Sequence, residues 1–255
     1  MRQVAFTQLT NIGKREINQD SILAKHSIIA KKHYAVFCVA DGVGGLADGS
    51  QASDLAVKAI EDWWEAYLPV LSGEEPPADS AICYELIKLF TTTNADIVEN
   101  AVEQNTRKGT TCSLLLICGK QCFVAHVGDS RIYLAERGYF SRSQFSLVTE
   151  DHTHRVDLLR QGVPIDEIDA NPQKNHLTSC LGVMEHPRIF TSAKRLKGRN
   201  TFVLCSDGVY NTMTDTEIET IVAEYKQHEH IANKLLVLAL ERETQDNASV
   251  VVVSC

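Results

Sequence analysis

The 255-residue sequence contains no apolar run long enough to cross a bilayer and no N-terminal segment with the order of a signal peptide. It also has no Cys-x-x-Cys pair, and its eight cysteines lie mostly inside apolar runs, as Cys38, Cys112, Cys118 and Cys205 do. This usage is typical of buried free thiols rather than of a disulfide framework or a zinc site. We therefore expect a protein of a reducing compartment, the cytoplasm, without membrane association.

Basic residues are outnumbered, with 25 lysines and arginines against 33 acidic residues and a formal net charge of −8. They form no run, and both features argue against binding to the phosphate backbone of a nucleic acid. No repeat, low-complexity segment or linker divides the chain, and its 44% hydrophobic and 23% charged fractions are ordinary for a globular protein. The sequence predicts one domain over residues 1–255, which we expect to be a monomer.

Periodicity predicts a mixed architecture of helices and short strands. Apolar residues recur at helical spacing over 50–68, 81–104, 153–161 and 231–242, and a capping box at Thr214 and Glu217 starts another helix. Apolar runs predict strands over 1–10, 21–29, 35–40, 201–206 and 248–253, with four more between 109 and 148. Turns too short for helical crossovers make these four antiparallel. The expected fold is α+β, with helices covering sheets and a proline-containing loop over 69–80.

Residues 151–182 are the most irregular part of the chain, and within them 163–179 mix prolines, acids and asparagines without clear periodicity. Long irregular segments in compact domains are often functional lids. We interpret His152 and His154, which open the preceding helix, as a partly exposed pair rather than as metal ligands. His176 is different, because it lies within the irregular segment and can approach a site.

Acidic residues stand at the ends of four apolar runs. The run 35–40 ends at Asp41, the run 201–206 ends at Asp207, Asp129 follows 122–127, and Asp246 precedes 248–253. A turn alone explains one such position, but not four in the same local context. Carboxylates gathered at strand ends in a low dielectric repel one another unless a cation lies between them, and hard divalent ions are the usual solution.

Six motifs that contain these residues resemble, in order, those of PP2C-type metal-dependent protein phosphatases, in particular the bacterial branch. They are REINQD (15–20), VADGVGG (39–45), GTTCS (109–113), HVGDSRIYL (126–134), LCSDGV (204–209) and QDNASVVVV (245–253). A single Asp-Gly pair at a strand end is common, but six motifs in order from Arg15 to Val253 are a specific signal.

The resemblance implies a Ser/Thr phosphatase with a central antiparallel β-sandwich flanked by helical layers, a metal site at one edge and a flap at about 163–180. It implies two ions, Mn²⁺ or Mg²⁺, whose bridging hydroxide attacks phosphorus in line. The implied metal positions are Asp41 with the Gly42 carbonyl, Asp207, Asp246, Asp20 acting through water, and Asp129 at a third, weaker ion. Arg15 would hold the substrate phosphate, a task that its planar donors suit.

Two positions depart from the family pattern. Gln19 stands where some members carry Glu, so any charge supplied there is missing. Val43 stands where some members carry a His for which a general-acid role has been proposed. The motif therefore does not identify the group that protonates the leaving alkoxide.

Two other function classes remain open. One is a non-catalytic phosphoprotein-binding module on the same fold, which loss of a metal carboxylate would favour, although Asp41, Asp207 and Asp246 are all present. The other is a metal-dependent phosphoesterase acting on small molecules, which nothing in the sequence excludes. For the phosphatase, the expected partners are phosphorylated proteins, such as a Ser/Thr kinase or its substrates.

Overall fold

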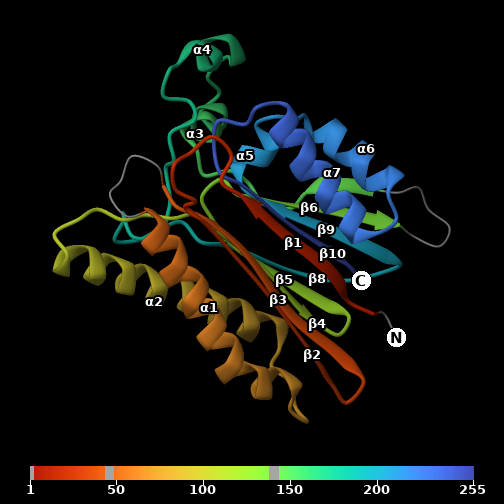
Figure 1. The fold of residues 1–255 in the computed structure, drawn as a ribbon. Helices are drawn as coiled ribbons and strands as arrows, with labels where there is room; N and C mark the ends of the chain where they lie inside the picture. Colours follow the sequence, from red (N-terminus) through yellow and green to blue (C-terminus); the bar gives the residue numbers. More distant parts are fainter. Residues whose placement is uncertain (1–2, 44–48, 138–143) are drawn as a thin grey trace.

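Two five-stranded antiparallel sheets pack together in the computed structural model, which describes residues 3–43, 49–137 and 144–255 (Figure 1). The first sheet has the order β1 (Ala5–Asn11), β10 (Ala248–Ser254), β9 (Arg199–Cys205), β6 (Arg131–Arg137) and β7 (Gln144–Leu147). The second has the order β2 (Asp20–Ile29), β3 (Lys32–Asp41), β4 (Cys112–Cys118), β5 (Gln121–Val127) and β8 (Phe190–Arg195). Met1 of the first predicted strand, and Gly44 and Gly45 of the glycine-rich motif, lie outside the described residues.

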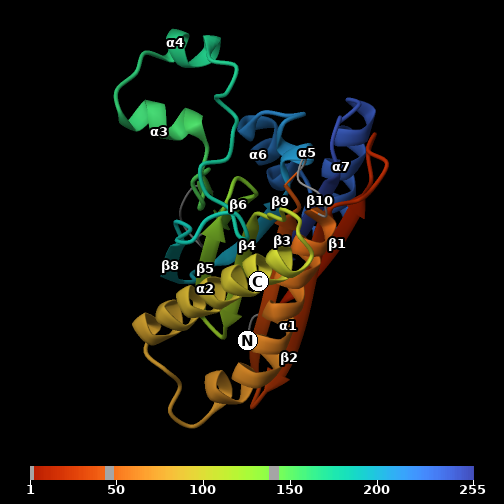
Figure 2. The same cartoon turned by 90° about the vertical axis from the view of Figure 1, so that its left-hand side faces the viewer.

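Helices cover the outer faces of both sheets. The long helices α1 (Gly49–Ser72) and α2 (Asp79–Glu103) lie on the second sheet, and α6 (Asp215–Glu224) and α7 (His228–Glu241) lie on the first (Figure 1). The four-residue helix α5 (Asp207–Tyr210) follows β9 directly. Helices α3 (His154–Arg160) and α4 (Ile165–Ala170) project beyond one end of the sandwich (Figure 2).

Strand β3 shows why the sequence forms these layers. Its residues 34–40 are all buried, and successive side chains point to opposite faces of the sheet. Val36 and Cys38 pack in the cluster under α1 and α2, whereas Phe37 and Val39 pack in the cluster between the two sheets. A third cluster joins the first sheet to the C-terminal helices. The predicted α+β fold, an antiparallel sandwich flanked by helical layers, is confirmed.

The predicted start of the loop over 69–80 is wrong, because α1 continues through Pro69 to Ser72. Proline in a helix interior removes one backbone hydrogen bond and usually ends the helix. Here the following turn carries Leu71, which is 2% exposed and belongs to the core cluster under α1 and α2. Burial of that side chain holds the last turn in helical conformation.

Other local predictions have mixed outcomes. The capping box forms, since the Thr214 hydroxyl accepts from the Glu217 amide and the Glu217 carboxylate accepts from the Thr214 amide. The irregular segment contains the short helix α4, which the sequence pattern does not reveal and which is anchored by the buried Ile168. All eight cysteines lie in the described ranges and are free thiols, as predicted. Among the described helices, none has the length and apolar character needed to span a membrane.

The strand register brings the acidic motifs to one end of the sandwich. Asp20 and Asp41 are directly opposite each other on β2 and β3. On the first sheet, Cys205 at the end of β9 is opposite both Arg131 of β6 and Val250 of β10. The chain segments that carry Asp129, Asp207 and Asp246 therefore meet at the same edge.

Candidate metal centre

A cavity of about 690 Å³ lies at this edge, and every predicted site residue except Asp20 lines it. These lining residues are Arg15, Asp41, Gly42, Asp129, Asp207 and Asp246. Asn175, His176 and Leu177 of the predicted flap segment also line the cavity. Residues more than 200 positions apart in the sequence thus share one concave surface with the irregular segment.

Backbone hydrogen bonds fix the position of Asp41. Its amide donates to the Thr111 hydroxyl at 2.9 Å, and its carbonyl accepts from the Thr111 amide at 2.8 Å. Gly42 follows where the chain passes very close to α1, because a Cβ on Gly42 would lie 2.4 Å from the Gly49 carbonyl oxygen. Any other residue at position 42 would displace this turn, and with it the carboxylate of Asp41.

Asp207 and Asp246 come from neighbouring turns of the first sheet. Asp207 opens α5 and accepts from the Asn211 side chain at 3.0 Å through one oxygen. Its other oxygen is buried and has no hydrogen-bond partner in the described part of the chain. Asp246 precedes β10 and accepts from the Arg15 guanidinium at 2.6 Å. Gly208 allows the two turns to meet, since a Cβ there would lie 2.0 Å from the Asn247 carbonyl oxygen.

Asp20 lies behind the cavity wall and is 7% exposed. The Ser206 hydroxyl donates to one of its carboxylate oxygens at 2.7 Å, and the other oxygen is left without a partner among the described residues. Burial raises the pKa of Asp20 to about 6, although hydrogen bonds from neighbouring serines oppose the shift.

Burial and mutual repulsion raise the pKa values of three carboxylates that line the cavity, those of Asp41, Asp129 and Asp207. The pKa of Asp41 lies well above its usual range, first because of burial and then because of the charges of Asp20, Asp207 and Asp129. Burial and neighbouring carboxylates also raise the pKa of Asp207 to about 7 and that of Asp129 to about 8. A group of ionised carboxylates is therefore costly here without added positive charge.

These residues fit a pair of hard divalent ions. The donors are carboxylate and backbone oxygens, and buried oxygens of Asp20 and Asp207 lack partners. Within the described ranges, no three Asp, Glu, His or Cys side chains already converge in the arrangement of a closed metal site. An ion that keeps part of its hydration shell, as Mg²⁺ does, needs few protein ligands and suits such an arrangement.

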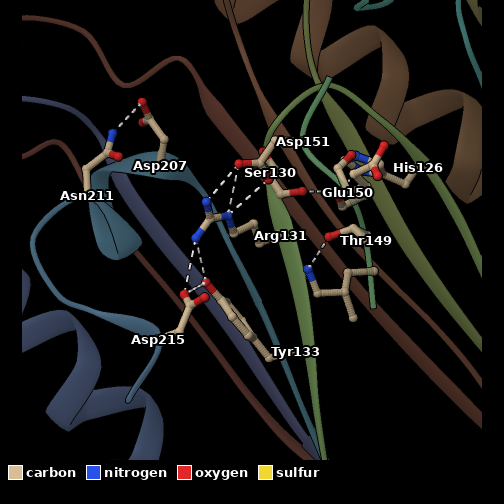
Figure 3. Close-up of polar contacts among 12 residues, drawn as sticks. His126, Ser130, Arg131, Tyr133, Thr149, Glu150, Asp151, Asp207, Asn211 and Asp215 are labelled. Carbon is tan, nitrogen blue, oxygen red and sulfur yellow. Dashed lines mark hydrogen bonds and ion pairs between the residues drawn. The ribbon is translucent and has the colours of Figure 1, made fainter. Parts of the chain in front are cut away.

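A partly buried arginine network beside the cavity is a feature that the sequence did not reveal (Figure 3). The Arg131 guanidinium donates to both oxygens of Asp151, at 3.0 and 2.7 Å, and to Asp215 at 3.2 Å. Its central carbon lies 3.9 Å from the centre of the Tyr210 ring. Arg131 follows Asp129 by two residues, and Tyr210 belongs to the short helix that begins with Asp207. The network thus connects two cavity carboxylates to the chain that leads into α3. The Gly-Asp-Ser-Arg sequence is the only signal for it, and that sequence does not identify the partners.

The interpretation of His152 as partly exposed is wrong. His152 is 6% exposed and its Nδ1 accepts from the Gly128 amide at 3.1 Å, which holds the turn before Asp129. His126, which is fully buried, lies with its ring 5.0 Å from that of His152 and bonds the Ser113 hydroxyl and the Glu150 carbonyl. His154 is half-buried, and its amide donates to the carbonyl of the cavity residue His176.

These two buried histidines predict a loss of stability in acid. Burial lowers the pKa of His126 to about 3 and that of His152 to about 4. Below about pH 6.5 the unfolded chain binds protons that the folded chain does not, so stability falls by about 1.4 kcal/mol per pH unit per histidine. We expect His126→Asn to lower the free energy of unfolding at pH 7. The gap, meaning the difference in free energy of unfolding between variant and wild type, should narrow by roughly 1–2 kcal/mol at pH 5. Denaturant unfolding of both proteins in chelator measures this gap.

The difference in stability between variant and wild type cancels the contribution of Asp41, Asp129 and Asp207, whose raised pKa values act in the opposite direction. His186→Asn serves as the control, because the His186 side chain is 89% exposed. A gap for His126→Asn that stays constant from pH 7 to pH 5 would contradict the prediction.

The two antiparallel sheets flanked by helical layers, with a carboxylate cavity at one edge, match the architecture that the six motifs imply, and the chain belongs to the protein phosphatase 2C family, whose model matches residues 7–240. It is 32% identical to the serine/threonine phosphatase stp of Listeria monocytogenes over 88% of this chain and 85% of that protein. The structure of the S. agalactiae serine/threonine phosphatase superposes with a TM-score of 0.82, at 28% identity, covering 98% of this chain and 99% of that one. The catalytic domain of PstP in complex with two manganese ions superposes with a TM-score of 0.76, at 25% identity, covering 98% and 97%. The family assignment made from the six motifs is confirmed.

Proposed function

We propose that this chain, as one domain, hydrolyses phosphoserine and phosphothreonine in proteins, using two divalent ions, Mn²⁺ or Mg²⁺. The observation that carries the proposal is the single cavity in which Asp41, Asp207, Asp246 and Arg15 meet, in a chain of the protein phosphatase 2C family. The relatives named as serine/threonine phosphatases and the relative solved with two manganese ions support it. Phosphoproteins, including a Ser/Thr kinase or its substrates, are the partners that this activity requires.

Each cavity residue has a proposed task. Asp41, assisted by the Gly42 carbonyl, would hold the two ions together with Asp207 and Asp246, and Asp20 would act through water from behind the cavity wall. When bound, the ions neutralise the carboxylates, polarise the phosphoryl group and make water nucleophilic at neutral pH. Arg15, at the mouth of the cavity with its side chain 47% exposed, donates to the phosphate oxygens. In the ion pair with Asp246 its guanidinium is already directed toward the site.

The flap proposed over residues 163–180 borders the reaction site. Asn175, His176 and Leu177 line the cavity, and the chain around them is held by hydrogen bonds from the His154 and Arg155 amides to the His176 and Lys174 carbonyls. We infer that this segment contacts the protein that carries the phosphate, because it is the part of the wall that is built from surface chain.

A substrate panel tests the proposed class. Phosphoserine and phosphothreonine peptides, nucleotides and sugar phosphates would be compared at equal concentration with saturating Mn²⁺. We expect the phosphopeptides to have the highest kcat/KM by a wide margin. Preference for a nucleotide or sugar phosphate would indicate a small-molecule phosphoesterase, and turnover of none would indicate a binding module.

Arg15→Ala separates phosphate binding from metal binding. Because its donors contact phosphate in both ground and transition states, we expect a higher KM and a reduced kcat on a phosphopeptide, with bound metal nearly unchanged. Lys14→Ala is a matched control, because the partner of Lys14 among the described residues is the exposed Glu243, at 3.5 Å. Normal kinetics for Arg15→Ala would show that this arginine is only a surface charge.

Asp129→Asn tests the proposed third, weaker ion. Asp129 lies in the turn between β5 and β6 and lines the cavity, so a metal held there would have few protein ligands and much water. We expect the variant to keep two tightly bound Mn²⁺ in calorimetry while losing much of its kcat on a phosphopeptide. Unchanged turnover at every Mn²⁺ concentration would leave Asp129 a turn residue, and loss of a tight ion would place it in the core site.

A further inference from the structure

A second cavity, of about 420 Å³, lies at the opposite end of the sandwich from the metal centre. It opens where the β2–β3 turn, the β4–β5 turn and the α1–α2 connection come together. Strand β3 runs from this cavity, at Lys32, to the metal centre, at Asp41. At about 3.3 Å per residue, the two sites are roughly 30 Å apart. This cavity is therefore separate from the phosphatase site.

The floor of this distal cavity is apolar. It is formed by Tyr34, Leu71, Ile82 and Phe123, which come from a strand, two helices and a second strand and are each at most 5% exposed. A hydrogen bond of 2.8 Å from the Gly119 amide to the His33 carbonyl joins the two hairpin turns at the mouth. A volume of this size lies within the range of about 300–1,000 Å³ that is usual for small-molecule sites.

The rim of the distal cavity is basic, although the protein carries a net charge of −8. Lys31, Lys32 and Lys120 are exposed at the rim, and none of them pairs with a carboxylate anywhere in the described ranges. The one acidic lining residue, Asp79, accepts a hydrogen bond from the Gln121 side chain at 2.7 Å. Three unpaired ammonium groups thus surround an apolar floor.

The turn that presents two of these lysines has an unusual backbone. Ala30 and Lys31 have φ values of +48° and +63°, a conformation that such hairpin turns usually fill with Asn-Gly. Side chains other than Gly, Asn and Asp are disfavoured there by about 1 kcal/mol or more each. Lys31 occupies this position despite the energetic cost, which points to a binding role for its side chain at the cavity.

We propose that the distal cavity binds a small amphipathic anion, an alkyl chain that ends in a carboxylate. The chain would lie against Leu71, Ile82 and Phe123, and the carboxylate would remain at the mouth among Lys31, Lys32 and Lys120. Charge complementarity selects this ligand, because an uncharged chain leaves the ammonium groups unpaired and a cationic one is repelled. A small ligand matches a volume of about 420 Å³ better than a protein segment, which would need an extended groove.

Isothermal titration calorimetry of the whole chain with decanoate tests this proposal. We expect one decanoate per chain, with decanol about tenfold weaker and decyltrimethylammonium weaker still. The variant Lys31→Gln/Lys32→Gln/Lys120→Gln should also lose about tenfold in decanoate affinity, since each exposed charge pair contributes a modest amount. The matched control is Lys88→Gln/Lys226→Gln/Lys234→Gln, which changes net charge equally at exposed lysines elsewhere and should bind as wild type does.

A second variant tests the position of the alkyl chain. Cys118 is half-buried and lines the cavity, so Cys118→Phe should fill part of it and weaken both decanoate and decanol. Its thermal unfolding reports whether the fold is intact. Absence of decanoate binding to the wild-type chain would overturn the proposal. Equal affinity for decanoate and decanol, or equal loss in both lysine triple variants, would also overturn it.

Discussion

Asp41→Asn and Asp207→Asn are each expected to lower turnover of a phosphoserine peptide by several orders of magnitude at saturating Mn²⁺. Each substitution removes a ligand charge from the proposed two-ion site, and the ions provide most of the charge stabilisation in phosphoryl transfer. The sandwich itself should remain intact. In chelator the variants should be at least as stable as wild type, because burial and carboxylate repulsion raise the pKa values of both residues.

Kinetics, metal binding by calorimetry and thermal unfolding in chelator together make this prediction decisive. Asp62→Asn is the control, since Asp62 is an exposed carboxylate on α1 whose ion-pair partner in the described part of the chain is Lys58. If the Asp41 and Asp207 variants bound two ions and kept near-normal rates, the assignment of these residues would be wrong. If they failed to fold, the loss of turnover would carry no information about metal binding, and unfolding in chelator detects that outcome.

Arg131→Met is expected to have the largest effect on stability, lowering the free energy of unfolding by about 3–5 kcal/mol. The substitution leaves the carboxylate of Asp151, whose side chain is only 13% exposed, without its bidentate partner. It also removes the guanidinium from the Tyr210 ring. Denaturant unfolding of the metal-free protein measures the effect apart from any change in metal affinity.

Arg242→Met provides the matched comparison for Arg131→Met. Arg242 also binds a carboxylate, that of Glu217, but the two side chains are 38% and 40% exposed, so the loss of stability should be much smaller than for Arg131→Met. The double variant Arg131→Met/Asp151→Leu should recover part of the stability, because no buried charge is then left unpaired. An Arg131→Met variant as stable as Arg242→Met would show that the network contributes little.

The strand-end acids could be predicted because each follows or precedes an apolar run that only a buried strand explains. Their convergence depends on the sheet register, which places Asp20 opposite Asp41 and the ends of β6 and β10 beside that of β9. Periodicity does not contain this information, and the ordered motifs supplied it through the family resemblance.

The features that the sequence did not reveal depend on partners far along the chain. The partners of Arg131 are Asp151 and Asp215, which are 20 and 84 residues away in the sequence. They lie beside Arg131 because of the packing of the first sheet and α6. From the sequence, Pro69 predicts a helix end, but burial of Leu71 in the core extends the helix past it. His152 is predicted at the surface, but its hydrogen bond to the Gly128 amide holds it inside. Local propensity was overridden in each case by burial against a distant segment.

The most direct test of the central claim is to remove and restore metal while measuring both turnover and binding. The whole chain would be treated with chelator, separated from it, and titrated with Mn²⁺ in calorimetry and in a phosphoserine-peptide assay. We expect no turnover above background without metal, and recovery of turnover as two ions bind per chain. Turnover that persists in the metal-free protein, or that returns without binding of two ions, would contradict it.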